Sequence, residues 1–326
     1  MRICLLTNQD LLAGKLPDGD WPCDPRPYYP EGHWEVECLK KATSVEQVKR
    51  RIADGFDLFF NLCDGAADQI DVPGIEVVQT LEGAGVAFTG STSEFYEPTR
   101  EEMKAACRKE NIPTPAYVLA RTAADVERAG RELRFPMIVK HHSSYSSVDL
   151  SKRSRVMSPA GLAVQARKIM RKHGAALIEE FIEGDECTVL VAEEPGDPLH
   201  PRTYVPLRYT FPDGETFKHA KLKWVDYDKM MAQPVDDPAL DARLRDVSAR
   251  FFLALRGASF GRCDIRVDRE GTPYMLEMNA NCGVFYPETD PGSADLILAR
   301  DPEGHVGFTR LLIRAALARH ARHRAG

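Results

Sequence analysis

Two carboxylates and a carboxamide near the C-terminal end of the chain have the residue types and spacing of a magnesium site. They are Asp264, Glu277 and Asn279, and they fall in the segment 261–283, GRCDIRVDREGTPYMLEMNANCG. Apolar and polar residues alternate on both sides of the turn-forming cluster DREGT, which predicts two strands joined by a short loop. Magnesium prefers hard oxygen ligands, and the neutral asparagine carbonyl would add a ligand without adding repulsion.

The register of this hairpin decides whether the two acids meet. Pairing Asp268 with Pro273 places Asp264 directly across from Glu277, with about 5 Å between their Cβ atoms. Facing carboxylates are destabilising unless positive charge lies between them. That charge is either a magnesium ion or a neighbouring arginine, and the candidate arginines are Arg262 and Arg266.

The same alternation predicts which face of the hairpin is buried. The expected core residues are Cys263, Ile265, Val267, Tyr274, Leu276 and Met278. The opposite face would carry Met275 together with the polar residues. After the second strand, the small residues that lead to Gly283 would let its backbone N–H approach a substrate closely.

This hairpin resembles the C-terminal signature of the ATP-grasp superfamily, most closely its D-alanine–D-alanine ligase-like branch. The resemblance is carried by RCD at 262–264 and LEMNANCG at 276–283. In that family such a hairpin binds ATP with Mg²⁺, so the resemblance implies both as cofactors, with Mn²⁺ as an alternative ion. An arginine and a glycine N–H stabilise an oxyanion in the family, which implies catalytic roles for Arg262 and Gly283.

Composition limits the class of protein. A chain of 326 residues and 36.4 kDa suffices for two or three domains, and a net charge of −6 argues against a general nucleic-acid binder. No apolar run approaches the roughly 18 residues of a membrane span. The eight cysteines form no CxxC pair, which is typical of reduced thiols. We therefore expect a cytoplasmic protein with neither nucleic acid nor a membrane as its partner.

The order of predicted elements divides the chain into three regions. The first region combines a strand at 2–7, a long loop at 8–34, a helix at 44–53 and a buried strand at 56–62. This alternation predicts a small open α/β domain with a parallel sheet, and the resemblance implies two α+β domains that clamp ATP. The expected ATP-grasp fold comprises an N-terminal substrate domain at 1–97, a central lid domain at 98–182 and a C-terminal catalytic domain at 183–326.

Two lysines in the central region match positions where the family holds nucleotide phosphates. Lys104 lies on a capped helix, and Lys140 ends the apolar strand 134–140. The loop after Lys140 keeps the Ser-Ser-Val core of the family's phosphate loop, which implies a catalytic role for Ser146 and Ser147. From the residues alone, a lysine at either place is an ordinary solvated side chain or an edge charge.

A third lysine is implied farther along the chain. Lys221 matches the lysine that the family brings to the phosphates from a loop before the final helices. Lys218 and Lys223 are close rivals for the same role.

The segment 175–191, AALIEEFIEGDECTVLV, predicts two strands joined at a hinge and resembles the family's adenine clamp. The resemblance implies contacts with the adenine ring from Glu179, Glu180, Phe181 and Ile182, and with the ribose from Glu186. A purine site needs a flat apolar slot with one donor–acceptor edge. Without the resemblance, these acids read as surface residues of a hairpin.

The last helix, predicted at 306–323, is rich in arginine. Its basic residues include Arg310, Arg314, Arg319 and Arg322. A solvated basic face is the default expectation, with a contact in a homodimer as the lesser alternative.

The motifs together imply an ATP- and Mg²⁺-dependent ligase that joins a small carboxylate to an amine through an acyl phosphate, with release of ADP and phosphate. The family's first-substrate acid has no match between Asn8 and Lys15, and GAADQID at 65–71 replaces its GEDG turn. We therefore expect a substrate other than D-alanine. The alternatives are an ATP-binding regulatory protein without ligase activity and an ATP-grasp enzyme of phosphotransfer or thioester chemistry.

Overall fold

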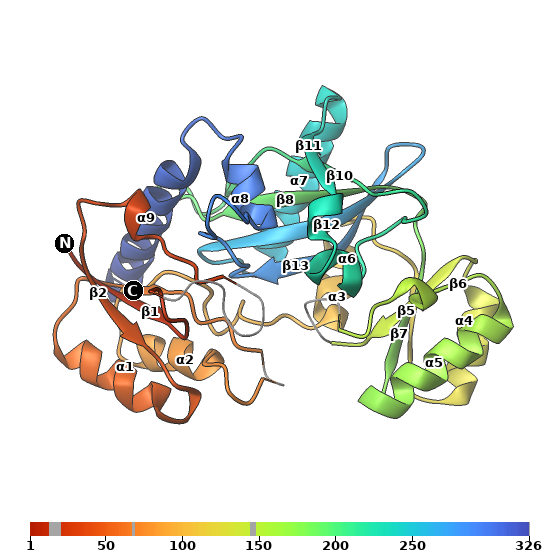
Figure 1. Cartoon of the computed structure of the whole chain (residues 1–326), viewed down its shortest axis with the longest axis horizontal. Helices are drawn as coiled ribbons and strands as arrows, with labels where there is room; N and C mark the ends of the chain where they lie inside the picture. The colour runs from red at the N-terminus through yellow and green to blue at the C-terminus, as the bar shows by residue number, and fades with distance from the viewer. Residues whose placement is uncertain (13–20, 67–68, 144–147, 326) are drawn as a thin grey trace.

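The computed structural model describes residues 1–12, 21–66, 69–143 and 148–325. Three sheets organise these residues, with three, six and four strands. The three-stranded and four-stranded sheets lie toward opposite ends of the molecule, and the six-stranded sheet lies between them (Figure 1). Within the described ranges, no helix is long and apolar enough to cross a membrane.

The N-terminal sheet is parallel, as the alternation of strands and helices and the apolar strand at 56–62 predicted. Its strands, in the order β2-β1-β3, are β2 (His33–Cys38), β1 (Arg2–Thr7) and β3 (Leu58–Asn61). The helices beside it are α1 (Ser44–Ala53) and α2 (Ile75–Gly83). The helix predicted at 44–53 is confirmed, but β2 was missed, because its residues are mostly exposed at the edge of the sheet and give no clear apolar pattern.

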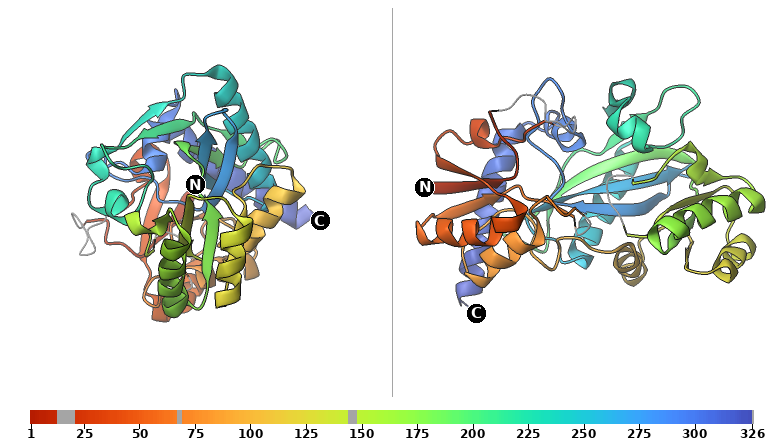
Figure 2. Two further views of the ribbon diagram at one scale, coloured as in Figure 1. Left: turned by 90° about the vertical axis from the view of Figure 1, so that its right-hand side faces the viewer. Right: turned by 60° about the horizontal axis from the view of Figure 1, so that its bottom comes forward.

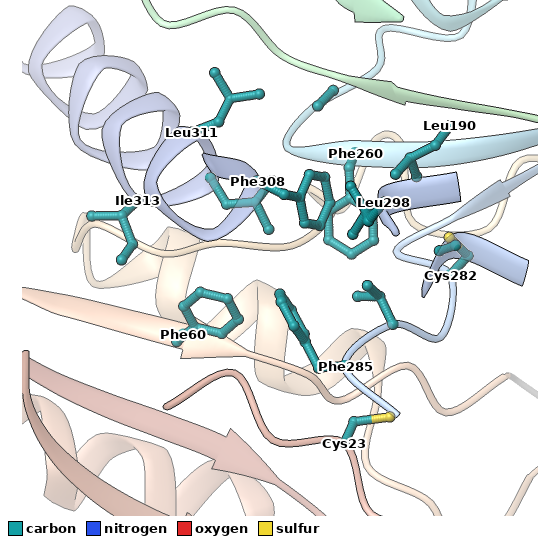
Figure 3. Packing of buried hydrophobic residues seen from close by; sticks show 14 of the residues in the cluster. Cys23, Phe60, Leu190, Phe260, Cys282, Phe285, Leu298, Phe308, Leu311 and Ile313 are labelled. Atoms are coloured by element: carbon teal, nitrogen blue, oxygen red, sulfur yellow. The ribbon is translucent and has the colours of Figure 1, made fainter. Parts of the chain in front are cut away.

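The two ends of the chain share one hydrophobic core (Figure 3). The C-terminal helix α9 (Gly304–Ala325) packs against β3, so Phe308 lies in the same cluster as Phe60. Phe285, from the loop after the hairpin, lies between them, with ring centroids 5.9 Å from Phe60 and 6.0 Å from Phe308. This packing holds the N-terminal sheet against the loop that follows the predicted magnesium residues.

The expectation of a solvated basic face on the last helix is wrong for Arg319. The residue is 8% exposed, and its guanidinium forms an ion pair with Glu193 and donates to the Phe88 carbonyl at 2.8 Å. Arg322 contacts the other carboxylate oxygen of Glu193 at 2.7 Å. The helix carries Arg319 into the junction between the end of the six-stranded sheet and the N-terminal region, where a buried acid receives it.

The central region contains a four-stranded antiparallel sheet, which lies at the far end of the molecule from the C-terminal helix (Figure 2). Its strands, in the order β4-β7-β5-β6, are β4 (Tyr117–Ala120), β7 (Ala176–Glu180), β5 (Met137–His141) and β6 (Arg155–Val156). The helices packed on it are α4 (Ala123–Glu132) and α5 (Pro159–His173). Thr122 and Ser158 cap their N-termini with side-chain oxygens, and Gly174 ends α5 with φ 79°.

The six-stranded sheet carries the hairpin. Its main path is β11 (Met231–Pro234), β10 (Leu207–Thr210), β8 (Gly184–Ala192), β12 (Phe260–Asp268) and β13 (Pro273–Ala280), with β9 (Arg202–Thr203) paired to β8. The helices around it are α3 (Arg100–Lys109), α6 (Ala220–Trp224), α7 (Pro238–Ala254) and α8 (Ser293–Leu298). Apolar side chains of α3 and α7 form one core cluster with the sheet.

The hairpin register is confirmed at the acids and wrong at the turn. Asp264 pairs with Glu277, but a bulge follows, so Val267 rather than Asp268 pairs with Pro273. The extra residue reverses the alternation beyond the bulge. Met275, predicted on the polar face, is therefore buried. Tyr274 and Leu276 were predicted in the core, but Tyr274 is only half-buried and Leu276 lines a cavity.

Two contacts hold the bulged strand in this conformation. The Met275 N–H donates to the Pro113 carbonyl at 2.8 Å, and the Thr114 hydroxyl donates to the Met275 carbonyl at 2.8 Å. The Pro-rich turn after α3 therefore acts as a partner for the edge of β13. Sequence alternation carries no information on this contact between distant segments.

Candidate active site

A cavity of about 850 Å³ lies where the three regions of the chain meet. Asn8 and Asp64 line it from the N-terminal region, Lys140 from the central sheet, and Asp264 from the hairpin. Such a cavity is large enough for a nucleotide and a small second ligand. The fold therefore brings together segments that are far apart in the chain.

The three predicted magnesium ligands line this cavity together. Asn279 donates through Nδ2 to an Asp264 carboxylate oxygen at 3.0 Å and to the Arg262 carbonyl at 3.3 Å. Glu277 forms an ion pair with Arg100 at 2.7 Å, and Asp264 forms a longer one with Arg262 at 3.4 Å. Arginines thus balance the facing acids, as one of the two explanations from the sequence required, but only Arg262 is one of the two arginines that it named. Arg266 pairs with Glu186 instead, at 3.4 Å, and Arg100 takes the place at Glu277.

The donor set fits magnesium chemically. Asp264 and Glu277 offer carboxylate oxygens, and the Asn279 hydrogen bonds described above use its NH₂ group rather than its carbonyl oxygen. Three hard oxygens beside a nucleotide-sized cavity suit an ion that keeps water and phosphate in its other positions. Among the described residues, no group of three or more His, Cys, Asp and Glu side chains could hold a metal by itself. A site here would therefore need the asparagine or the phosphates.

Lys104 and Lys140 meet at a single buried acid. Glu179 lies 2.6 Å from the Lys104 ammonium and 2.5 Å from the Lys140 ammonium, and its side chain is 1% exposed. Burial alone would raise the pKa of Glu179, but the two lysines outweigh it and lower that pKa to about 2. Burial lowers the pKa of Lys140, and Glu179 partly opposes this shift.

The structure places Arg100, rather than Lys104, at the cavity surface. Lys104 lies behind Glu179 and donates to the Thr114 hydroxyl at 2.6 Å, whereas Arg100, one turn earlier on α3, lines the cavity. Residues four apart share one face of a helix, so the sequence carried this signal. The resemblance implied a role only for the lysine, so Arg100 was not among the predicted residues.

The predicted adenine residues form one wall of the cavity. Glu180, Phe181 and Ile182 line it, but the Glu180 carboxylate is held by Arg134, with a shortest contact of 2.7 Å. The Phe181 N–H donates within the fold, and the Ile182 carbonyl accepts from Arg266 at 2.9 Å. Several hinge groups predicted to read the adenine edge are therefore already engaged in hydrogen bonds within the fold.

The predicted ribose acid, Glu186, also lines the cavity. It lies 3.4 Å from Arg266 and accepts from the Lys218 N–H at 3.3 Å. Burial raises the pKa of Glu186 despite these neighbours. It is thus a buried acid with basic residues around it and not the surface residue that the hairpin alone suggested.

The structure favours Lys218 over Lys221 as the cavity lysine from this loop. The Lys221 side chain is 68% exposed and pairs with Asp226 at 3.2 Å, whereas Lys218 lines the cavity. The Lys218 ammonium lies 3.5 Å from the centroid of the Tyr209 ring. The predicted residues Ser146 and Ser147 lie outside the described residues.

Arg262 and Gly283 line the same cavity as the acids. Arg262 is 8% exposed, and a Cβ added at Gly283 would come within 2.8 Å of the Tyr286 hydroxyl. The glycine thus lets the Tyr286 ring lie close to this backbone, and a larger residue would displace that ring. Cys282, which precedes Gly283 and also lines the cavity, has its pKa raised to about 12 by burial, so it remains a thiol.

Comparisons with known proteins agree with this geometry. A family model described as the D-ala D-ala ligase C-terminus matches residues 107–287. The chain is 28% identical over 230 residues to the uncharacterized protein y4sG of Sinorhizobium fredii, covering 70% of this chain and 66% of that protein. It is 29% identical over 209 residues to the D-alanine–D-alanine ligase of Ralstonia nicotianae, covering 63% of this chain and 60% of that protein. The chain thus spans less than two thirds of the length of these two relatives.

Solved structures resemble the chain over nearly its whole length. The D-alanine–D-alanine ligase of Bacillus anthracis, solved with ATP, superposes with a TM-score of 0.69 at 16% identity, covering 99% of each chain. The VanG D-Ala:D-Ser ligase of Enterococcus faecalis superposes with a TM-score of 0.68 at 13% identity, covering 97% of this chain and 99% of that chain. These likenesses show the ATP-grasp fold, which confirms the predicted fold class. Because the family model covers more than half of the chain, this protein belongs to the D-alanine–D-alanine ligase C-terminal family.

Proposed function

We propose that this protein is an ATP- and Mg²⁺-dependent ligase that joins a small carboxylate to an amine and releases ADP and phosphate. The observation that carries the proposal is a single cavity shared by the acids of the hairpin, the adenine-clamp strand and Lys140. Relatives of the family are named as D-alanine–D-alanine ligases, which supports ligation over regulatory binding. We place the reaction in the cytoplasm, where reduced thiols such as those of this chain are stable.

The hairpin would hold the metal through Asp264, Glu277 and Asn279. Magnesium bound there supplies charge neutralisation of the β- and γ-phosphate oxygens. Arg100 and Lys140 supply further positive charge at the cavity, and Lys218 adds more from the loop before α6. Because Arg100 and Arg262 neutralise the acids in the structure, a metal at the acids would leave both arginines available to substrate oxygens.

The carboxylate takes the γ-phosphate to form an acyl phosphate, and the amine then attacks the acyl carbon. The Arg262 guanidinium and the Gly283 N–H would stabilise the resulting oxyanion, with about 3 kcal/mol for each donor. Val148 and Leu150 line the cavity and would help to exclude water from the acyl phosphate.

We propose a substrate other than D-alanine. Asn8 and Gln9 line the cavity from the segment where an acid would hold the first D-alanine in the family. A neutral amide there supplies no charge for an ammonium group. The chain would then differ in its substrate from the relatives that are named for D-alanine.

The test is a screen for ADP release with pairs of amino acids, small carboxylates and amines, using labelled ATP. ADP with inorganic phosphate and an amide product is the expected outcome. A phosphorylated product would replace ligation by phosphotransfer. ATP binding without ADP release from any pair would contradict the proposal.

A further inference from the structure

The loop from Gly283 to Gly292, which carries the proposed oxyanion donor, contains a strongly constrained residue. Phe285 has φ 71°, in the left-handed region that residues with bulky side chains rarely adopt. Its ring is buried in the core cluster beside Phe60 (Figure 3). A backbone conformation of this kind is unfavourable by itself and persists only where surrounding contacts impose it. Those contacts therefore show what holds the loop in place.

Asp295 of α8 accepts hydrogen bonds from two separate points of this loop. One carboxylate oxygen accepts from the Phe285 N–H at 2.8 Å, and the other accepts from the Gly292 N–H at 3.0 Å. Asp295 is 3% exposed, so water competes little for these hydrogen bonds. A single buried carboxylate thus ties residue 285 to residue 292.

His305 of α9 holds this carboxylate in turn. Its Nε2 atom lies 2.8 Å from the Asp295 oxygen that Phe285 also uses, and its ring stacks on Tyr28 with 4.7 Å between the centroids. A carboxylate only accepts hydrogen bonds, so the contact requires a hydrogen on Nε2. Neither Asp295 nor His305 is among the described residues that line the cavity, so both can influence a reaction there only through the loop.

The N-terminal segment 21–28 contacts the same loop directly. The Asp24 N–H donates to the Phe285 carbonyl at 3.0 Å, and Trp21 donates from Nε1 to the Asp290 carboxylate at 2.6 Å. Both backbone groups of Phe285 are therefore engaged, one by this segment and the other by the carboxylate of α8. The segment belongs to the long N-terminal loop, to which no sequence motif assigns a role.

We propose that Asp295, held by His305, is a positioning residue for the reaction: it fixes the loop so that the Gly283 N–H stays where the oxyanion forms. This inference rests on the proposed function, in which Gly283 is an oxyanion donor. Such a donor is effective only if it is in place before the charge develops, and a shift of about 1 Å can lower a rate about a hundredfold. Gly283 lies two residues before Phe285, so only a short stretch of backbone separates the constraint from the donor.

Asp295→Asn tests this role directly, because it keeps the shape of the side chain but replaces one acceptor oxygen by an NH₂ group. That group cannot accept from a backbone N–H, so one point of the loop is released. His305→Phe keeps a ring against Tyr28 and removes only the hydrogen bond to Asp295. Asp301→Asn is the matched control, since Asp301 also accepts from a backbone N–H and a guanidinium, both of residues outside the loop.

The assay separates the two chemical steps and needs no knowledge of the natural amine, because hydroxylamine traps an acyl phosphate as a hydroxamate. Enzyme in excess over ATP is mixed with Mg²⁺, hydroxylamine and, one at a time, glycine, acetate and succinate. The carboxylate that gives the most hydroxamate serves as the probe. ADP formation in a single turnover reports transfer of the γ-phosphate. Hydroxamate formation reports attack of the hydroxylamine nitrogen on the acyl carbon, with loss of phosphate.

A positioning role predicts different effects on the two steps. We expect Asp295→Asn to slow hydroxamate formation about tenfold to a hundredfold and to leave ADP formation within about twofold, since the oxyanion develops only in the second step. His305→Phe should slow hydroxamate formation by a smaller factor, because Asp295 keeps both backbone hydrogen bonds. Asp301→Asn should change neither rate. Hydrogen exchange followed by mass spectrometry should show faster exchange in peptides covering 283–292 for Asp295→Asn and not for Asp301→Asn.

The outcomes separate this inference from the proposed function. An unchanged rate of hydroxamate formation in Asp295→Asn would overturn the inference, assign the pair to fold stability alone and leave the ligase proposal standing. An equal fall in both rates, or unchanged exchange in the loop, would also overturn it. No hydroxamate from the wild-type protein with any carboxylate would overturn both. His305→Phe decides the question if melting temperatures show that Asp295→Asn does not fold.

Discussion

The buried acid between two lysines offers the sharpest test of the site's electrostatics. Glu179→Gln keeps the shape of the side chain but removes the charge that pairs with Lys104 and Lys140. Removing one partner of a buried ion pair costs about 3–5 kcal/mol, because the remaining charge is left without compensation. Here two ammonium groups would be left, so we expect a loss in that range.

The pKa of the acid gives an independent magnitude. A carboxyl group whose pKa falls from 4.5 to about 2 on folding contributes about 3 kcal/mol at neutral pH. That contribution is fully present above pH 4.5 and is lost as the pH falls toward 2. The advantage of the wild-type protein over Glu179→Gln should therefore be about 1 kcal/mol smaller at pH 3.5 than at pH 7.

The neighbouring residue supplies the control. Glu180 lies next to Glu179 on β7, but its partner Arg134 has a side chain that is 83% exposed. Glu180→Gln should therefore cost no more than about 1 kcal/mol. Hydrogen exchange of the β5 and β7 amides, followed by mass spectrometry, measures the local opening free energy in each variant. Equal protection in the two variants would refute the reasoning that the lysines depend on Glu179.

Three further substitutions test the remaining assignments. Glu277→Gln should lower ATP turnover about a hundredfold or more, because the metal loses an anionic ligand, with little change in melting temperature; near-normal ADP release would remove Glu277 from the metal site. Arg100→Met should raise the KM for ATP about tenfold; an unchanged KM would return the phosphate role to Lys104. Arg319→Met should destabilise the protein by about 3 kcal/mol or more in urea unfolding, against less than about 0.5 kcal/mol for the exposed Arg314→Met. Equal losses would mean that the buried pair with Glu193 contributes nothing.

Local patterns predicted much of the fold. The helix at 44–53 follows from helical periodicity, and the hairpin of β12 and β13 follows from alternation around a turn. The pairing of Asp264 with Glu277 also follows, because it depends only on the loop and the strand period close to the acids. These features are local in the chain, so short stretches of sequence contain them.

The bulge in β13 shows where local patterns fail. Alternation assigned Leu276 to the core and Met275 to the polar face, whereas the structure buries Met275 and turns Leu276 toward the cavity. The cause is a partner segment, Pro113 and Thr114, more than 150 residues earlier in the chain, which binds the backbone of Met275 at the bulge. Only the folded chain brings that partner to the strand.

The sequence by itself determined the set of chemical groups: the acids of the hairpin, a series of basic residues and an adenine-clamp strand in the order typical of one fold. Tertiary structure alone decided which basic side chain faces which acid. It turned Lys104 inward to Glu179, brought Arg100 and Lys218 to the cavity, and buried Arg319 against Glu193. The physical reason is that a charge in a low-dielectric interior must meet a partner, and folding decides which partners lie within reach.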